Sequence, residues 1–327
     1  MIVLTSEDVA KLLPMPAAIE VIDATMKLVS EGGAELPLRS AIPVGGINKL
    51  GIMPGAITAP DASCFGVKLL SLFPDNPKRG LSSHLGAFVL FDAETGQARA
   101  MMDASLLTAL RTAAASGVAT RALARQDASA LTLVGYGEQA EHHLDAICAV
   151  RDIKTVQVAG RDAAKAAAFC ATAKTHYPQI AFTAGTDVQS AVAQADIVCT
   201  VTASATPVLH HAWLPEGCHV NVVGSSIPTM REVDDDFVLN MPIWVDYLPS
   251  TRVQAGEIVD LIADGRFTED RIMAEIGMVL AGEASGRTSE EQQTAYRSLG
   301  VAAQDLMAAK AVVEAATAQG IGQAVQL

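Results

Sequence analysis

Charged residues are scarce in this chain, and acidic ones outnumber basic ones. They make up 18% of the 327 residues, against 50% hydrophobic residues, a balance that excludes the disordered class and indicates a globular protein. The net charge of −13 disfavours a phosphate backbone as partner, and no cluster of Lys and Arg with interleaved aromatic residues offsets it. We therefore expect no nucleic-acid partner.

Paired cysteines and membrane-length apolar segments are also missing. The five cysteines are odd in number, widely spaced and without a C-x-x-C pair, which is typical of thiols in a reducing compartment. No stretch of 18 uncharged apolar residues appears, and Glu7 and Asp8 stand where a signal peptide would need a basic flank. These absences predict a cytoplasmic protein with no membrane partner.

The length of the chain predicts about two domains. Residues 6–30 carry helix signals, with Ser6 as the expected N-cap before Glu7 and Asp8. Residues 36–103 contain short apolar runs separated by Pro and Gly turns, which favours antiparallel strands and hairpins. Residues 104–125 are rich in Ala and Leu and lack proline, so we expect one long helix that bridges the domains.

From residue 130 onward, strand-like and helix-like runs alternate. This alternation predicts a Rossmann-type α/β fold, a doubly wound parallel sheet covered by helices on both faces. A last long helical run, at 298–320, follows the completed pattern and could return to the first domain. The expected strands of the parallel sheet are 130–137, 155–160, 180–184, 196–202, 219–225 and 242–247.

A glycine-containing turn joins the first of these strands to a helix. Its first glycine permits a tight turn, its second lets the backbone approach a pyrophosphate, and the alanine allows close packing of helix on strand. The free N–H groups at the helix start add an anion-binding end. This pattern predicts a dinucleotide site that includes Gly135, Gly137, Glu138, Gln139 and Ala140.

The end of the next strand bears on the choice of dinucleotide. An acid there would hold the ribose 2′-hydroxyl of NAD, but the residues after the strand are Gly160, Arg161 and Asp162. An arginine suits a 2′-phosphate, because a guanidinium can pair with it bidentately. We therefore expect NADP(H). The alternative is that Arg161 caps a loop in solvent and that NAD(H) binds, because Asp162 could still reach a ribose.

The chain carries several ordered motifs, at residues 67–96, 102–125, 133–147, 200–209, 221–236 and 297–310. Over nearly the whole chain they resemble those of the ornithine cyclodeaminase/mu-crystallin family. The resemblance implies a homodimer in which a Rossmann domain, residues 119–299, is inserted into an α+β substrate-binding and dimerisation domain, residues 1–118 plus 300–327. It leaves several activities open: ornithine cyclodeamination, alanine dehydrogenation, reduction of cyclic imino acids by NAD(P)H, and non-enzymatic ligand binding as a crystallin.

The same resemblance implies substrate-binding residues. Lys68 would bind the substrate carboxylate or protonate the nitrogen of a C=N bond, and Arg111 would clamp the carboxylate. Arg39 resembles a second carboxylate-binding arginine, and Met53 lies in a neighbourhood where cyclodeaminases carry a substrate-contacting glutamate. Asp305 matches a position near the substrate or cofactor. The alternatives are a solvent-facing strand residue at Lys68, a solvated helix residue at Arg111 and a helix-surface acid at Asp305.

Further cofactor contacts follow from the resemblance and from the position of strand ends. Thr112 and Ser116 resemble contacts on the phosphate side of the cofactor. Thr202 and Ser204 come just after a strand's carboxyl end, where open α/β sheets bind ligands, although plain turn residues are the alternative. His142 and His143, like the other adjacent histidine pair, lack a carboxylate at metal-ligand spacing. We therefore predict no catalytic metal.

One position departs from the family's cyclodeaminases, which carry an aspartate in a G-x-D-x-P motif. The run here begins at Gly224 and places Ser226 where that aspartate would be. A serine without an adjacent base cannot abstract a proton near neutral pH.

Reduction of a preformed cyclic imine demands less of the protein. We therefore predict an NAD(P)H-dependent reductase of Δ1-pyrroline-2-carboxylate or Δ1-piperideine-2-carboxylate, with Ser226 holding a water or the imine nitrogen. An amino-acid dehydrogenase or cyclodeaminase using NAD is the alternative.

Overall fold

The computed structural model describes residues 1–326, with the side chain of Pro77 left aside. The chain divides into two compact units. Unit 1 comprises Met1–Arg111 and the segment from Val301 onward, and unit 2 comprises Thr112–Gly300. The first division falls inside α3 (Ala104–Leu123), the long helix expected from the sequence. It lies a little before the boundary drawn at residue 118.

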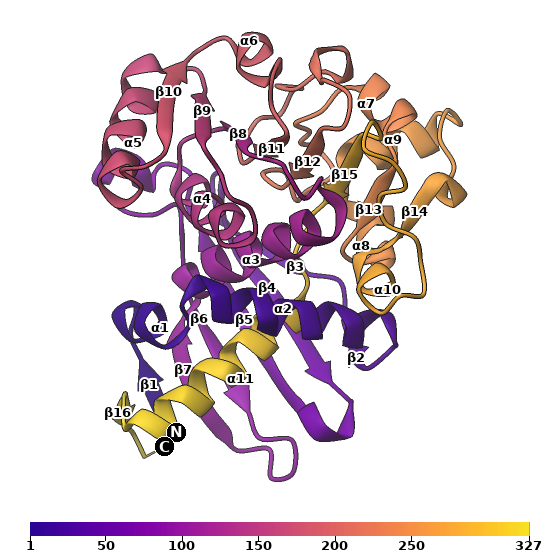
Figure 1. Cartoon of the computed structure of the whole chain (residues 1–327). Helices are drawn as coiled ribbons and strands as arrows, with labels where there is room; N and C mark the ends of the chain where they lie inside the picture. The colour runs from indigo at the N-terminus through magenta and orange to yellow at the C-terminus, as the bar shows by residue number, and fades with distance from the viewer. Residues whose placement is uncertain (327) are drawn as a thin grey trace. The chain divides into compact units, whose positions relative to one another are not determined.

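Unit 1 is built on an eight-stranded sheet with the order β16-β1-β7-β6-β5-β4-β2, and β3 pairs with β4 (Figure 1). All pairings among β2 to β7 are antiparallel, which confirms the expected hairpins, whereas β1 runs parallel to β7. The strands are β1 (Ile2–Leu4), β2 (Ala34–Glu35), β3 (Ser40–Gly45), β4 (Asn48–Ile57), β5 (Cys64–Leu72), β6 (His84–Phe91), β7 (Ala98–Asp103) and β16 (Gln323–Ala324).

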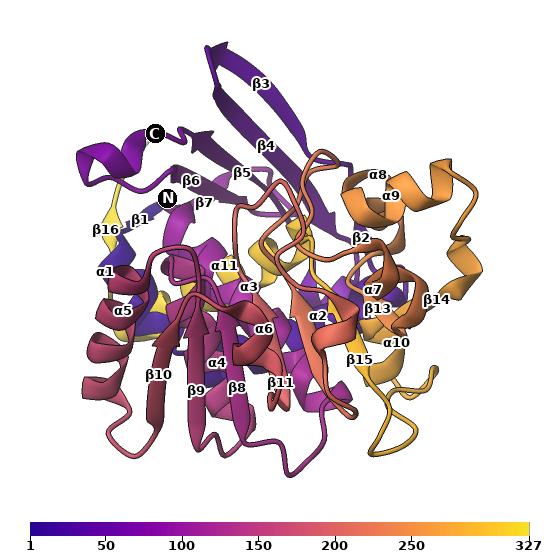
Figure 2. The ribbon, with the colours of Figure 1, turned by 90° about the horizontal axis from the view of Figure 1, so that it is seen from above.

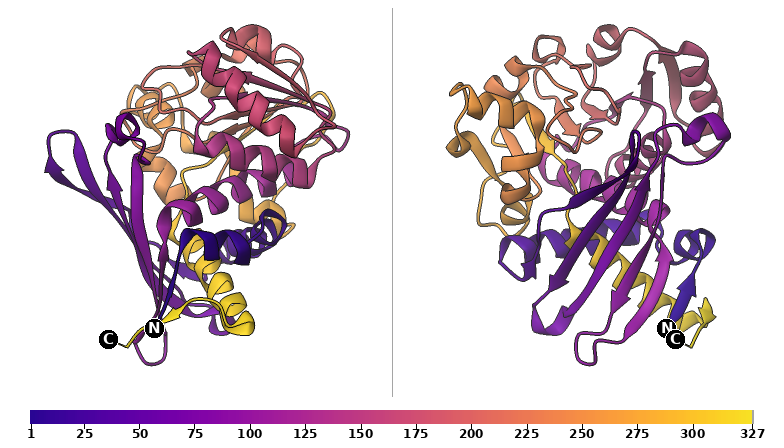
Figure 3. Two further views of the ribbon diagram at one scale, coloured as in Figure 1. Left: turned by 90° about the vertical axis from the view of Figure 1, so that its left-hand side faces the viewer. Right: turned by 180° about the vertical axis from the view of Figure 1, so that it is seen from behind.

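The helices of unit 1 gather on one face of this sheet (Figure 3). They are α1 (Ser6–Leu12), α2 (Met15–Ser30) and α11 (Ala302–Gln319). The last of them contacts β4, β5, β6 and α2, so the C-terminal helix belongs to the same core as the N-terminal third of the chain. Two 3-10 helices, Pro60–Ala62 and Asn76–Arg79, complete the unit.

The start of α1 differs by one residue from the expected one. Thr5, not Ser6, is the N-cap, because its hydroxyl accepts a hydrogen bond from the Asp8 backbone N–H while the Asp8 carboxylate accepts one from the Thr5 N–H. This reciprocal capping box satisfies two helix-end donors. Both Thr5 and Ser6 fit the sequence pattern of an N-cap, and only the reciprocal bonds with Asp8 identify Thr5 as the N-cap.

The other face of the unit 1 sheet, which we call the outer face, is apolar. Phe65 of β5 lies opposite Phe91 of β6, and their rings stack with centroids 5.1 Å apart. Val89 lies opposite Met101 on the same face. Phe65 is 37% exposed and Met101 also 37%. A soluble monomer rarely leaves a continuous apolar sheet face uncovered.

Unit 2 contains an eight-stranded sheet in which every neighbouring pair is parallel, in the order β10-β9-β8-β11-β12-β15-β13-β14 (Figure 2). The six strands expected from the sequence are all present, and β14 and β15 are additions. The strands are β8 (Ala130–Val134), β9 (Thr155–Ala159), β10 (Ala181–Gly185), β11 (Ile197–Thr200), β12 (His219–Val222), β13 (Ile243–Val245), β14 (Ile272–Glu275) and β15 (Thr294–Arg297).

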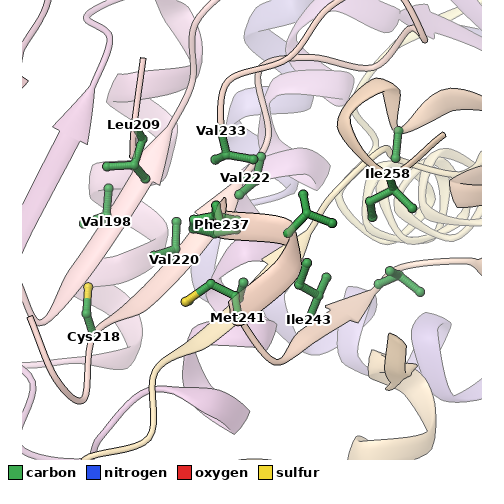
Figure 4. Close-up of a cluster of buried hydrophobic side chains, with 14 of the residues drawn as sticks. Val198, Leu209, Cys218, Val220, Val222, Val233, Phe237, Met241, Ile243 and Ile258 are labelled. Carbon is green, nitrogen blue, oxygen red and sulfur yellow. The ribbon is translucent and has the colours of Figure 1, made fainter. Parts of the chain in front are cut away.

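Helices cover both faces of the parallel sheet. Val198 of β11 enters one hydrophobic cluster, whereas its neighbours Ile197 and Cys199 enter another, because successive strand side chains point to opposite faces. The first cluster includes residues of α7 and α9 (Figure 4), and the second includes residues of α4 and α5. This confirms the predicted doubly wound α/β fold. The helices are α4 (Glu138–Val150), α5 (Ala163–His176), α6 (Val188–Val192), α7 (Asp235–Asn240), α8 (Leu248–Gln254), α9 (Gly256–Ala263) and α10 (Ile276–Leu280), with 3-10 helices at His211–Trp213 and Glu269–Arg271.

The C-terminal end of α3 is held by an arginine. Arg151 donates from its guanidinium to the carbonyls of Thr120 and Ala124, both at 2.9 Å, and to that of Arg125 at 2.8 Å. Few N–H donors are left for the carbonyls at the end of a helix, and here one side chain donates to a carbonyl of the last turn and to two carbonyls just after it. Within residues 1–326, no helix is both long and apolar enough to cross a membrane.

Candidate functional site

A buried lysine on β5 of unit 1 is paired with an aspartate of α11. Lys68 is 1% exposed and lies on the helix-covered face of the sheet, opposite Met53 on β4 and Phe88 on β6. Its Nζ donates to both carboxylate oxygens of Asp305, at 3.0 Å to Oδ1 and 2.8 Å to Oδ2. Asp305 is fully buried. Lys68 is therefore not a solvent-facing strand residue, and Asp305 is not a helix-surface acid.

Arg111 of α3 joins the same carboxylate. Its Nε donates to Asp305 Oδ1 at 3.0 Å, and its Nη1 donates to Gln304 Oε1 at 3.0 Å. Gln304 in turn donates from Nε2 toward the Met26 sulfur, so its amide oxygen is turned to the arginine. One carboxylate thus serves two buried cations, which leaves a surplus of positive charge in this cluster.

The pKa values of Lys68 and Asp305 reflect the presence of two cations around one carboxylate. Burial, followed by the charge of Arg111, lowers the pKa of Lys68 to about 7, although Asp305 acts in the opposite direction. Burial alone would raise the pKa of Asp305, but Arg111 and Lys68 together hold it below its usual value. Arg39, half-buried between β2 and β3, also contributes to the lowered pKa of Lys68. Lys68, Arg111, Arg39, Met53 and Asp305 thus lie in one neighbourhood.

The glycine turn of unit 2 follows β8. Gly135 has a φ of 117°, and a Cβ there would lie 2.9 Å from the Val201 carbonyl oxygen, so only glycine fits. A Cβ at Gly137 would meet no protein atom within 4 Å. The fold itself therefore does not require glycine at 137, whereas a ligand that approaches the backbone would. Gly137 is the N-cap of α4 and makes no side-chain cap, and Ala140 is fully buried.

The turn is tied to the end of β9 through a tyrosine. A Cβ at Gly160 would lie 2.3 Å from the Tyr136 ring, and the Tyr136 hydroxyl accepts a hydrogen bond from the Asp162 N–H at 3.2 Å. The Asp162 carboxylate accepts from the N–H groups of Ala164 and Lys165 as the N-cap of α5. Arg161 beside it is exposed. The acid at this strand end is thus engaged in capping, and the arginine faces solvent.

Two candidate cofactor residues lie on the part of α3 that belongs to unit 2. Thr112 and Ser116 are both buried. The Ser116 hydroxyl lies 2.9 Å from Nε2 of His143, whose Nδ1 is 2.7 Å from the Gln139 carbonyl oxygen. Ser116 is therefore linked through one imidazole to the first turn of α4, a link that the sequence did not predict.

The loops after β11 and β12 carry the remaining candidates. Thr202 and Ser204 are partly buried after β11, and Ser226 is partly buried after β12. Both loops converge on Glu232, a fully buried residue that accepts hydrogen bonds from Thr202 and from the Gly224 N–H. Glu232 was not predicted from the sequence, because an acid among several others in the run from 231 to 236 has no distinguishing pattern.

Metal-binding groups do not gather in the part of the chain that the structure describes. No three His, Cys, Asp or Glu side chains there are placed to hold an ion. The five cysteines form no disulfide, and all but Cys148 are buried.

Similarity to known proteins extends over the whole chain. The model of the ornithine cyclodeaminase/mu-crystallin family matches residues 1–320. A Δ1-pyrroline-2-carboxylate reductase of Bacillus cereus is 34% identical over 328 residues, which cover 100% of both chains. The solved structure of Thermococcus litoralis Δ1-pyrroline-2-carboxylate reductase in complex with NADH and L-proline has a TM-score of 0.95 at 32% identity, and covers 99% of this chain and 100% of that chain. An archaeal alanine dehydrogenase dimer with bound NAD has a TM-score of 0.92 at 30% identity, over 100% and 99% of the two chains.

Proposed function

We propose that this chain, which belongs to the ornithine cyclodeaminase/mu-crystallin family, is an NAD(P)H-dependent reductase of a cyclic imino acid. It would convert Δ1-pyrroline-2-carboxylate or Δ1-piperideine-2-carboxylate to L-proline or L-pipecolate. The observation that carries the proposal is the buried cluster in which Lys68 and Arg111 share Asp305. Full-length similarity to a Δ1-pyrroline-2-carboxylate reductase supports the same reaction.

The arginines of unit 1 would hold the substrate carboxylate. Arg111 is bonded to Asp305 and Gln304 through two of its nitrogens, so its planar group is oriented before a ligand arrives. Arg39 lies close enough to Lys68 for its charge to lower the pKa of that lysine. An anionic substrate would offset the surplus positive charge, and its binding is favoured for that reason.

Lys68 would supply the proton of the reaction. The reduced nicotinamide supplies a hydride to the imine carbon when it is bound. Two of the three Lys68 N–H groups donate to Asp305, which leaves one for the ring nitrogen. As the C=N π bond breaks, its electron pair moves to the ring nitrogen, which takes the proton from Lys68, and the neutral lysine then recovers a proton from water. A pKa of about 7 matches a general acid that works near neutral pH.

The measurement that tests this function is oxidation of NADPH and NADH with each of the two cyclic imino acids. We expect turnover with at least one of the four pairs and a product that is L-proline or L-pipecolate. No turnover with any pair would contradict the proposal and would favour a ligand-binding role without catalysis.

A second candidate is oxidation of an amino acid with NAD, which is favoured by the similarity to the archaeal alanine dehydrogenase. Ser226 offers a hydroxyl and no carboxylate for proton abstraction, which argues against cyclodeamination in particular. In the reductase, Ser226 would hold a water or the imine nitrogen. Reduction of NAD by L-alanine, or ammonia release from ornithine, at rates above those of imine reduction would favour the second candidate.

Unit 2 would hold the dinucleotide at the carboxyl ends of its parallel strands. Open space over Gly137 and the uncapped start of α4 suit a pyrophosphate, because the backbone N–H groups there can bind an anion. The side chain of Ser116 would act through His143, to which it is bonded. The further contacts that we propose are those of Thr112, Gly135, Glu138, Gln139, Ala140, Thr202, Ser204 and Ser226.

We propose NADP(H) as the preferred cofactor, because Arg161 is exposed at the strand end where Asp162 is engaged as an N-cap. Arg161→Ala should raise the KM for NADPH about tenfold or more, since a hydrogen bond to a charged group is lost, and should change the KM for NADH little. The matched control is Lys154→Ala, which removes a positive charge directly before the first residue of β9, at the end of the strand away from Arg161. Equal changes for both cofactors would contradict a role of Arg161 in binding the 2′-phosphate.

We also propose that the chain forms a homodimer through the outer face of unit 1. The stacked pair Phe65 and Phe91, together with Met101, gives this face the apolar character of a surface that requires a partner. Light scattering of the purified chain decides the matter, because a mass of one subunit would contradict the proposal.

A further inference from the structure

Glu232 collects hydrogen bonds from the ends of two neighbouring strands. Its Oε1 accepts from the Thr202 N–H at 2.6 Å and from the Thr202 hydroxyl at 2.8 Å. Its Oε2 accepts from the Thr200 hydroxyl at 2.9 Å and from the Gly224 N–H at 2.6 Å. All four donors are neutral groups of the segments at the end of β11 and β12. One buried side chain thus fixes both segments at once.

The two segments also touch each other directly. A Cβ added at Gly224 would lie 2.0 Å from the Thr202 carbonyl oxygen, 2.3 Å from the Thr202 nitrogen and 2.6 Å from Glu232 Oε1. Side-chain atoms are not tolerated at such distances, so the backbones pack with glycine as the only residue that fits. The position of one loop therefore determines the position of the other.

The backbone of Glu232 is anchored from the opposite side. Its carbonyl oxygen accepts hydrogen bonds from the N–H groups of Val208 and Leu209. The next residue, Val233, pairs with Leu209 as an isolated bridge and packs in the hydrophobic cluster around Phe237 (Figure 4). The carboxylate is therefore presented to the loops from a rigid support and cannot withdraw without disturbing this core.

A second buried group fixes the residue after Gly224. Arg297 of β15 donates to the Ser225 hydroxyl at 3.0 Å and forms a buried ion pair with Glu257 at 2.5 Å. Gly224 is thus held by Glu232 and Ser225 by Arg297. Together these bonds fix the position of the backbone directly before Ser226. On the β11 side, the Thr202 hydroxyl that donates to Glu232 also accepts from the Ser204 N–H at 3.3 Å.

The strand order indicates which part of a dinucleotide these loops would meet. The pyrophosphate is assigned to the turn after β8, and the adenosine ribose to Arg161 after β9. Because β9 and β11 lie on opposite sides of β8 in the sheet, the other nucleoside falls to the ends of β11 and β12. Thr202, Ser204 and Ser226 stand there.

We propose that Glu232 is the positioning residue of the nicotinamide half of the cofactor site, which it forms in advance by holding the loops 201–206 and 224–226 in contact. The proposal rests on the dinucleotide binding proposed above. It assigns to Glu232 no contact with the cofactor. Its effect passes through Thr202 and Gly224, and it should therefore be confined to ligands that carry the nicotinamide riboside.

Glu232→Gln is the variant that tests this assignment. A glutamine has one acceptor oxygen, so its NH2 group would face either the Thr202 N–H or the Gly224 N–H, and one loop must move away. We expect the affinity of the purified protein for NADPH, measured by calorimetry, to fall about tenfold or more. The affinity for ADP, which lacks the nicotinamide riboside, should change by less than about twofold.

Asp196→Asn is the matched control. Asp196 lies just before β11, at the amino-terminal ends of the strands and thus at the end of the sheet away from Glu232. Its carboxylate accepts hydrogen bonds from the N–H groups of Ser129 and Ala130 at 2.8 and 2.9 Å. This variant also removes a carboxylate that joins two strands, but it should leave the affinities for both NADPH and ADP unchanged. A general loosening of unit 2 would weaken ADP as well, and would affect the two variants alike.

The outcomes separate this inference from the proposed function. Wild-type protein that binds neither NADPH nor NADH would overturn the proposed function together with the inference. Wild-type binding with equal NADPH affinity in Glu232→Gln, or with equal losses for NADPH and ADP, would overturn the inference alone. If Glu232→Gln does not fold, Thr200→Val removes one of the four donors, and it should weaken NADPH about threefold without affecting ADP. Unchanged NADPH affinity in that variant would equally overturn the inference.

Hydrogen exchange of the protein without cofactor gives a readout that does not depend on binding. In Glu232→Gln, the amides of Thr202 and Gly224 should exchange at least about tenfold faster than in the wild type, whereas those of β8 and β9 should keep their rates. Uniform acceleration across unit 2 would indicate a purely structural role and would overturn the assignment.

Discussion

Replacing Lys68 with methionine should lower kcat/KM for imine reduction by about 10²–10⁴-fold, the usual contribution of a general acid. Methionine keeps much of the length of the side chain and places no charge on the covered face of β5, where Lys68 is 1% exposed. NADPH affinity should be unchanged, because the proposed dinucleotide contacts belong to unit 2. Steady-state NADPH oxidation and calorimetry measure the two quantities.

The pH dependence of this variant provides the decisive comparison. With a pKa of about 7 for Lys68, wild-type kcat/KM should fall about tenfold per unit as the pH rises above that value, since only the protonated amine can donate. Lys68→Met should lose this pH dependence of kcat/KM. Any dependence that remains in the variant arises from protonation of the substrate itself. Lys49→Met, at an exposed position of the neighbouring β4, is the control and should keep both rate and slope. An unaltered profile in Lys68→Met would contradict the proton-donor role.

The lowered pKa of Lys68 also makes the free energy of unfolding depend on pH. The pKa of Lys68 is lowered from 10.5 to about 7 in the folded chain, so between these values the unfolded chain binds more protons. The free energy of unfolding should therefore rise with pH across this window through Lys68, and this contribution is lost as the pH falls through about 7. Lys68→Met should flatten that part of the profile in urea unfolding.

Asp305→Asn should reduce the free energy of unfolding by about 3–5 kcal/mol, the usual cost of removing one partner from a buried ion pair. The substitution leaves Lys68 and Arg111, which are 1% and 4% exposed, without a counter-charge. It also lowers the pKa of Lys68 further, because Asp305 is the group that raises it. We therefore expect a large loss of activity at pH 7 together with the loss of stability.

A double variant separates these two effects. Asp305→Asn combined with Lys68→Met removes one of the uncompensated cations, and it should recover part of the lost stability but no activity. Glu314→Gln is the control on the same helix, where an exposed pair with Lys310 should contribute at most about 0.5 kcal/mol. If the stability changes of Asp305→Asn and Lys68→Met simply add in the double variant, Lys68 and Asp305 are not energetically coupled.

The parallel sheet was largely predictable because most of its strands are short apolar runs between helical segments. The strand β15, Thr294–Arg297, was not predicted, since an arginine in a central strand looks like part of a loop. Burial of Arg297 is possible because Glu257 pairs with it, and that partner lies 40 residues away in the sequence. Tertiary pairing of this kind leaves no local pattern.

The site was predictable only in part, for the same physical reason. Lys68, Arg111 and Asp305 were identified by resemblance, but no pattern could indicate that the first and last of them pair across 237 residues. Ser116 was expected to contact the phosphate side of the cofactor, and its pairing with His143 had no signal in the sequence. Glu232 was not identified at all, because two of its hydrogen-bond donors are backbone N–H groups, which every non-proline residue carries.

The position of Asp305 in the last helix imposes an order on the folding of the chain during synthesis. Unit 2 is continuous in sequence and can fold as soon as residue 300 has left the ribosome. Strands β1 to β7 of unit 1 emerge earlier. Their packing is incomplete until α11 is synthesised, because this helix contacts β4, β5 and β6 and carries the counter-charge of Lys68. A nascent chain that stops before residue 301 therefore has a complete unit 2, whereas its unit 1 sheet lacks α11 on one apolar face and is uncovered on the other. Such a chain should depend on chaperones, and Lys68 acquires its counter-charge only with α11.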